Sequence, residues 1–451
     1  MTSKYQLRPR VGPIRLWSGL AMILVLIFPA SDAMAQTAAQ SSQPAPEPIF
    51  TLERALSLGG AVSPSREAGA AGVQAATAGR AVAALRPNPE IVVETENVTG
   101  SGDYRGFRSA ETTAGVALPI ELGGKRSARM AVADAQIDSA RISATVAIAD
   151  LTLTITQAYI EAAASERRLI VAREQAVLAA EGARAARVRV TAGAASPIEQ
   201  QRAEVLRINA ETAVERAART AEVARGNLAR LIGQPVTGLL DTTWFERIGG
   251  YGPTQPVTAE GTLALAAAAA DARTAKAQVQ LARSQRVPDV TVSASARRLE
   301  ATNDVAAVFG VSVPIPLFNN GRAAVAQATA QATQAEALRR LALIEAERGI
   351  ASAQAELANA ATTARTAGGP ALTAAAEAAR IARIGYAAGK FSQLDLLEAE
   401  RTLRETRAAA IDALAAYRDA EARLARLTAP STLSADQTLS NARSALPGDI
   451  R

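Results

Sequence analysis

A long run without proline or glycine, residues 125–181, constrains the fold of this chain more than any other feature. One apolar row in this run contains Met130, Ile137, Ala144 and Leu151, and a second contains Val146, Leu153 and Ile160, both with a spacing of seven residues. Two apolar rows on one helix require neighbouring helices on two sides. Continued to about Thr191, the helix would be roughly 100 Å long. The sequence therefore predicts a long spacer helix, for which a soluble coiled-coil rod is the alternative.

The first 35 residues are typical of an export signal. Basic side chains precede an apolar run at residues 20–28, and the small residues Ala33 and Ala35 mark a cleavage site. A retained membrane anchor is the alternative, but the apolar run is short for a bilayer span. The chain contains no cysteine, which excludes disulfides, thiol chemistry and lipidation of a terminal cysteine.

Composition argues against catalysis and against nucleic-acid binding. Aromatic residues make up only 3% of the chain, and the alanine-rich apolar content suits closely packed helices. The formal net charge is +6, but arginine and acidic residues alternate along helical stretches such as 211–222, as on solvated faces. With no histidine, no cysteine and no Gly-x-Ser-x-Gly or Walker-type loop, we expect no catalytic residues, no cofactor and no resident metal.

A first structural unit is predicted to follow a Pro/Ser/Gln-rich linker at residues 36–50. A helical segment begins near Thr51, is interrupted around residues 59–64 and ends before Arg86. Strand-like composition then occupies residues 91–97 and 111–118, on either side of a polar, glycine-rich turn. The second strand places Thr112, Ala114, Val116 and Leu118 on one face. We predict a β-hairpin, with strands within about 90–119, followed by a long helical hairpin at 124–232.

The same order of elements recurs in the second half of the chain. Pro288 corresponds to Pro89 and Pro314 to Pro119, and the matched positions lie 199 and 195 residues apart. We therefore predict a duplication. The first repeat covers residues 51–234 and the second 261–429, with strands at about 289–314 and a helical hairpin at 321–428. The long helix of the second repeat is expected to match that of the first in length. An irregular segment, 235–260, separates the repeats, and a polar tail, 430–451, follows them.

A Gly-x-x-Ser-x-x-acid motif stands at the turn of each helical hairpin. The motif residues are Gly193, Ser196 and Glu199 in the first copy and Gly389, Ser392 and Asp395 in the second, preceded by Arg187 and Arg383. Each glycine can end a helix in a left-handed conformation, each serine can cap the next helix, and each carboxylate can reach back to the cap. Pro197 suits the first helical position. Capping alone is one interpretation, and repetition at both tips favours a docking surface.

Four strands cannot close a barrel, and an open sheet edge is not tolerated in lipid. If the hairpins enter a membrane, other subunits must therefore complete them, which predicts an oligomer. A soluble four-stranded sheet is the alternative, but it leaves the length of the helices unexplained.

These features together resemble the TolC-like outer-membrane efflux channels over nearly the whole mature chain. The resemblance implies a mainly α fold with a small membrane β part. It further implies a homotrimer, in which a 12-stranded β-barrel in the outer membrane of a Gram-negative bacterium is continued by a periplasmic α-helical barrel. Its partners would be a periplasmic adaptor, an inner-membrane RND pump and outer-membrane lipid. The residues that would dock the adaptor are Arg187, Gly193, Ser196, Glu199, Arg383, Tyr386, Gly389, Ser392 and Asp395.

Two strand-to-helix junctions resemble the CzcC-type heavy-metal branch of these channels. They read PIELGGKR at residues 119–126 and VPIPLFNNGR at residues 313–322. The junction residues are Pro119, Gly123, Gly124, Pro314, Pro316 and Gly321. We expect proline to stop the strand ladder, glycine to allow the corner, and basic residues to start the helix near the membrane interface. Junctions that are architectural and silent about cargo are the alternative.

The resemblance to this branch implies passive export of cobalt, zinc, cadmium, nickel or copper ions, chosen by the pump. Two other functions stay open on sequence alone. A multidrug efflux channel would share the architecture. A periplasmic adaptor or structural coiled coil would be expected to carry one helical hairpin flanked by β-rich domains, rather than two hairpins with strands at the opposite end.

Overall fold

The computed structural model describes residues 49–249 and 258–431, which belong to one compact unit, Glu47–Arg451. The predicted export signal, most of the linker, the middle of the inter-repeat segment and nearly all of the polar tail lie outside the described residues. None of the helices described is both long enough and apolar enough to cross a membrane.

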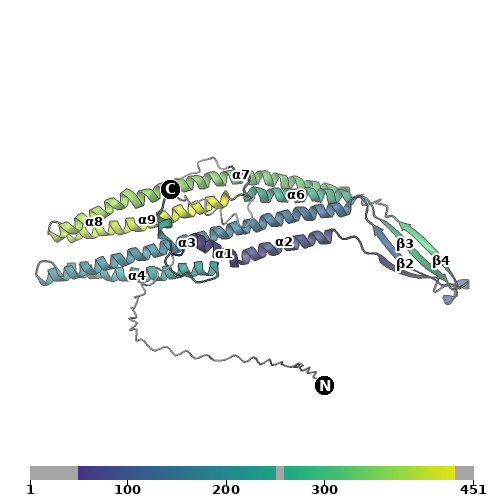
Figure 1. Ribbon diagram of the computed structural model, residues 1–451, viewed down its shortest axis with the longest axis horizontal. Coiled ribbons are helices and arrows are strands. Elements are labelled where there is room, and N and C mark those ends of the chain that lie inside the picture. The colour runs from purple at the N-terminus through teal and green to yellow at the C-terminus, as the bar shows by residue number, and fades with distance from the viewer. Residues whose placement is uncertain (1–48, 250–257, 432–451) are drawn as a thin grey trace, which may run out of the picture. The chain divides into compact units, whose positions relative to one another are not determined.

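The predicted spacer helix is confirmed as α3, Lys125–Thr191, which is unbroken over 67 residues. Its neighbours include α2 (Pro64–Ala83), α4 (Pro197–Ile232), α6 (Leu263–Ser284) and α9 (Gln393–Leu427), and Figure 1 shows α2 and α4 following one another along it. Ile137 and Ile160 of the two predicted rows are buried. Helices on several sides of α3 are what two apolar rows require.

The helix predicted from Thr51 forms as α1, Leu52–Val62, and α2, with Ser63 capping the second. Between the repeats lies the short helix α5, Thr242–Glu246. A buried cluster joins α1 and α5 to α3 and α4 and includes Phe50, Tyr159 and Phe245. The Tyr159 hydroxyl donates to the Phe50 carbonyl oxygen over 2.7 Å and accepts from the Asp241 amide over 3.0 Å.

A second cluster packs α9 against α7, Arg322–Thr366, through alanines, Leu357 and Tyr417. Beside it the buried Arg418 donates to the carbonyl oxygens of Trp244 and Arg247. Its guanidinium carbon lies 4.5 Å from the centre of the Trp244 ring. Arg418 thereby fastens the inter-repeat segment to the second repeat, because it donates to two main-chain carbonyl oxygens at the end of α5, of which that of Trp244 also accepts from the Arg247 amide.

The expectation of an equally long, continuous helix in the second repeat is wrong. After α7, a π-helical turn at Ala367–Ala371 precedes α8, Leu372–Ala387. The turn contains Pro370, and Gly369 has the non-helical angles φ −103° and ψ −106°. Proline has no N–H to donate and its ring clashes with the preceding turn, so the helical ladder is interrupted here.

The four strands form one antiparallel sheet in the order β1 (Glu90–Glu96), β2 (Glu111–Ile120), β3 (Val290–Leu299) and β4 (Asp304–Ser312). Both predicted hairpins are therefore present, and they are joined through the pairing of β2 with β3. In this order β1 and β4 are the edge strands. Because β2 leads through a short corner into α3, the sheet lies at the opposite end of α3 from its turn with α4 (Figure 1).

Candidate functional site

The sheet has one apolar face, and this face is exposed. Strand alternation and register place Ile91, Val116, Ala294 and Phe309 in one row across all four strands. Phe309 is 82% exposed and Ile91 83%. Further exposed apolar residues of this face are Val93, Leu118, Ile120, Val292, Val305 and Val311. A sheet in water buries its apolar face, so this surface suits contact with lipid.

The opposite face of the sheet is polar or carries small side chains. It includes Ser293, Ser295 and the charged residues of the outer turns. Arg297 there donates to the Glu111 carboxylate over 2.8 Å and lies 3.3 Å from that of Glu96. Charges that pair with one another can face an aqueous interior next to a lipid-facing apolar surface.

The first junction is clamped by two ion pairs. Arg129 binds the Glu121 carboxylate with two nitrogens and also donates to the Leu85 carbonyl oxygen over 3.0 Å. The Lys125 ammonium lies 2.7 Å from the Asp289 carboxylate. The hydrogen bond from Arg129 lowers the pKa of Glu121. Burial raises the pKa of Asp289, but the bonds from Lys125 and from a backbone amide outweigh this and lower it overall.

The junction glycines behave as predicted. Gly124 and Gly321 are the cap residues of α3 and α7, both with φ 71°. Gly123 has φ 70°, and a Cβ there would come within 2.6 Å of Val287 and 2.9 Å of a main-chain oxygen. The corner therefore needs glycine for its conformation and, at Gly123, also for space.

The prolines of the two junctions differ. Pro119 does not stop the ladder, because it lies opposite Thr291 within the β2–β3 pairing, which continues to Ile120. On its other side β1 has already ended, opposite Ala117, so the missing N–H costs no ladder bond. Pro314 and Pro316 follow the end of β4, as expected.

At the tips, both glycines end their helices as predicted. Gly193 has φ 73° and Gly389 φ 70°, and each lies in a turn closed by main-chain hydrogen bonds, such as that from the Ala194 amide to the Arg189 carbonyl oxygen at 2.8 Å. Ser196 caps α4 and Ser392 caps α9. The tips thus share a backbone design, a helix stop followed by a serine cap.

The acidic residues of the two motifs do different work. Asp395 completes the predicted capping box, accepting from the Ser392 amide over 3.0 Å. The same expectation for Glu199 is wrong, because its carboxylate accepts instead from the Tyr386 hydroxyl, over 3.2 Å. The Glu199 carboxylate is engaged by a residue of the second repeat, whereas Asp395 turns back to the cap of its own helix.

Tyr386 therefore joins the two tips. The Arg189 guanidinium carbon lies 4.6 Å from the centre of its ring, and the Gln393 side chain donates to the Glu199 carbonyl oxygen over 3.0 Å. Burial raises the pKa of Tyr386, as does its bond to Glu199. Arg189 and Gln393 were not predicted, since neither belongs to the repeated motif and Arg189 corresponds to Gly385 in the second copy.

The two tip arginines are not equivalent. Arg383 is bound to Glu400 within its own hairpin. Arg187 is exposed, while Glu204, the counterpart of Glu400, pairs with Arg207 over 2.6 Å. Arg187 thus keeps its charge directed to solvent at the first tip.

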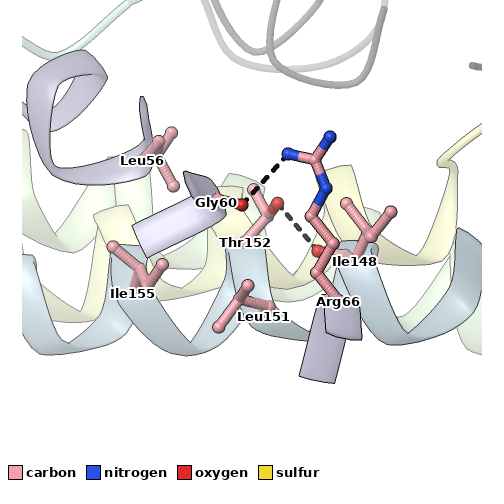
Figure 2. Close-up of a pocket in the computed structure, with 7 residues that line it drawn as sticks. All are labelled: Leu56, Gly60, Arg66, Ile148, Leu151, Thr152 and Ile155. Atoms are coloured by element: carbon pink, nitrogen blue, oxygen red, sulfur yellow. Dashed lines mark hydrogen bonds between the residues drawn. The ribbon is translucent and has the colours of Figure 1, made fainter. Parts of the chain in front are cut away.

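A small hollow lies where α1 and α2 meet α3. It is lined by Leu56, Gly60, Arg66, Ile148, Leu151, Thr152 and Ile155 (Figure 2). Its polar groups are satisfied inside the protein, since Arg66 donates to the Gly60 carbonyl oxygen over 3.1 Å and Thr152 to that of Ile148 over 2.9 Å. No cluster of three or more acidic, histidine or cysteine ligands occurs among the residues that the structure describes.

An outward apolar sheet at one end of a long helical stem, with paired tips at the other end, is the architecture of a membrane-associated protein. The family model for outer membrane efflux proteins matches residues 61–234 and 258–429, and the chain belongs to this family. It is an outer-membrane protein of the TolC-like fold.

The chain is 30% identical over 413 residues to the cobalt-zinc-cadmium resistance protein CzcC of Cupriavidus metallidurans, covering 87% of this chain and 94% of the relative. It is 30% identical over 333 residues to the nickel-cobalt-cadmium resistance protein NccC of Alcaligenes xylosoxydans xylosoxydans, covering 72% and 74%. The outer membrane protein VceC of Vibrio cholerae has the same fold, with a TM-score of 0.69 at 19% identity over 84% of this chain and 96% of that one.

Proposed function

We propose that this chain is the exit channel of a tripartite system that exports divalent heavy-metal cations. The observation that carries the cargo is its similarity to the cobalt-zinc-cadmium resistance protein along nearly the full length of both chains. The channel is passive: it offers a path, while an inner-membrane RND pump selects the ion and supplies the energy. A path for hydrated cations needs no resident ligand, which agrees with a chain that has neither histidine nor cysteine.

The working form is a homotrimer. Edge strands β1 and β4 each present an unpaired main-chain edge in a single copy, and lipid does not tolerate such edges. Pairing β4 of one copy with β1 of the next satisfies both, and three copies would give 12 strands. Each copy contributes its two repeats, 51–234 and 261–429.

The tips dock a periplasmic adaptor. Exposed apolar side chains occupy matched positions on both: Ile198 and Leu394 follow the serine caps, and Val188 and Ile384 precede the glycines. Apolar residues that stay exposed at both ends of a duplication suit a partner that binds each tip in the same manner. The predicted tip residues, from Arg187 to Asp395, shape and charge the rim of this surface.

Deleting the gene from its native host tests the cargo. The deletion strain should become more sensitive to cobalt, zinc, cadmium or nickel salts than to dyes and antibiotics, and the intact gene should restore growth. Sensitivity to organic compounds without any metal phenotype would instead assign the chain to multidrug efflux.

Docking is tested by charge substitution at the tips. Ile198→Asp and Leu394→Asp should abolish crosslinking to the adaptor and metal resistance while the protein still folds and reaches the membrane. Val223→Asp is the matched control, because Val223 is equally exposed on α4 but far from the turn. Full crosslinking in both tip variants would contradict docking at the tips and leave the cargo proposal standing.

A further inference from the structure

An apolar stripe on the edge strand continues past the end of the sheet. Every second residue from position 305 to 317 is apolar and exposed: Val305, Ala307, Phe309, Val311, Val313, Ile315 and Leu317. Only the first four belong to β4. The segment that follows, residues 313–318, ends in a bend where the Leu317 amide donates to the Ile315 carbonyl oxygen over 2.9 Å.

The strand alone is long enough for the membrane. A tilted strand of about 9–11 residues crosses the hydrocarbon layer, and β4 has 9 residues. Segment 313–318 therefore lies beyond the hydrocarbon layer, on the helix side, at the level of the lipid headgroups. Its side chains remain apolar there, with Leu317 78% exposed and Phe318 fully exposed.

The first junction has no comparable feature, although it is built from the same repeat. Counted from the matched prolines Pro119 and Pro314, Phe318 aligns with Gly123, the glycine whose Cβ would collide with Val287, and the second junction has two more residues before its cap, Gly321. Pro316 corresponds to Glu121, which is tied to Arg129. Ion pairs thus hold the first junction against the helices, whereas Phe318, the largest apolar side chain of the second junction, is exposed.

Cationic side chains border the segment on the helix side. Arg322, the first residue of α7, is exposed. Arg286 is also exposed, and its Nε donates to the Asn320 carbonyl oxygen over 3.3 Å. Aromatic and aliphatic side chains next to arginine form the arrangement that suits a headgroup layer, in which acyl chains meet phosphates.

We propose that residues 313–318 form an interfacial anchor that binds phospholipid at the periplasmic surface of the outer membrane. Ile315, Leu317 and Phe318 enter the boundary between acyl chains and headgroups, and Arg286 and Arg322 attract lipid phosphate. Continuity with the apolar sheet face favours lipid over a second protomer, because pairing the edge of β4 engages its main-chain groups and leaves the apolar side chains of its face exposed. The anchor sets the depth of the channel and is independent of its cargo.

The cysteine-free chain allows single labels to test this anchor. Phe318→Cys, Ala307→Cys and Lys390→Cys each carry an environment-sensitive fluorophore, in full-length protein reconstituted into phosphatidylethanolamine and phosphatidylglycerol vesicles; Ala307 is exposed near the middle of β4. Nitroxide lipids with a shallow or a deep quencher, and iodide in water, then report depth. Phe318 is fully exposed, so its replacement removes no packing.

The label at 318 should lose most emission with the shallow quencher, that at 307 with the deep quencher, and that at 390 with iodide. Glutamine at both Arg286 and Arg322 should reduce the shallow quenching at 318 in vesicles with phosphatidylglycerol. Iodide quenching at 318 equal to that at 390 would overturn the proposal. So would protection of 318 from every quencher, which would place the segment against a second copy.

Discussion

Removing the Tyr386 side chain should let the two tips separate. Its hydroxyl donates to the Glu199 carboxylate over 3.2 Å, a charge-assisted bond that contributes about 1 kcal/mol at a partly buried position. Arg189 lies 4.6 Å from the ring centre, which adds about 0.5–1 kcal/mol. Tyr386→Ala removes both contacts, about 2 kcal/mol, and should raise the population of separated tips about thirty-fold. Tyr386→Phe keeps the ring and should give a smaller effect.

Double electron–electron resonance between spin labels at Ala194→Cys and Lys390→Cys measures the separation of the two tips. Dilution with unlabelled protein isolates the distance within one protomer. Tyr386→Ala should lengthen and broaden the distances, and Glu199→Gln should do so less. Asp395→Asn is the matched control, since its carboxylate caps α9 within one tip. Unchanged distances in Tyr386→Ala, or an equal change in Asp395→Asn, would refute the assigned roles.

Three further outcomes are expected. Gly123→Ala should lower thermal stability more than Gly124→Ala, because both have φ near +70° but only the former Cβ would approach a main-chain oxygen within 2.9 Å; equal melting temperatures would contradict this. Arg418→Ala should cost about 2 kcal/mol in denaturant unfolding, because the Arg247 carbonyl oxygen loses a buried donor, while that of Trp244 keeps the Arg247 amide. Acid should loosen the first junction, because the pKa values of Glu121 and Asp289 are lowered in the folded protein. The stabilisation from these two carboxylates is complete above about pH 4.5 and is lost as the pH falls through the lowered pKa values. Faster amide hydrogen exchange at the first junction in acid would show this loss.

Local chemistry made much of the fold predictable. The absence of helix breakers from 125 to 181 predicted most of α3, and Gly193 marked its end, while Gly182 lies within the helix without ending it. Gly193 and Gly389 correctly predicted helix ends, because glycine adopts the positive φ of a helix stop without strain. Ser196 and Ser392 announced helix starts for an equally local reason, the hydrogen bond from a serine oxygen to a free main-chain N–H.

The sequence also contains the cause of the kink at Ala367–Ala371, the helix breakers Gly368, Gly369 and Pro370. It was missed because comparison with the first repeat suggested a second unbroken helix. A duplication reports what two copies share, and it gives no weight to a residue that stands in one copy alone. The two hairpins differ physically, because the second contains a break in its helix that separates α7 from α8.

The same limit explains why the joint between the tips could not be predicted. Aligning the copies pairs Glu199 with Asp395, and an identical role follows for both. Which acceptor each carboxylate finds depends on a neighbour brought by the other repeat: Tyr386 reaches Glu199, while Asp395 has its own cap. The contact between the two repeats uses residues that differ at matched positions. The asymmetric residues Arg189 and Tyr386, rather than the repeated glycines and serines, therefore hold the two tips together.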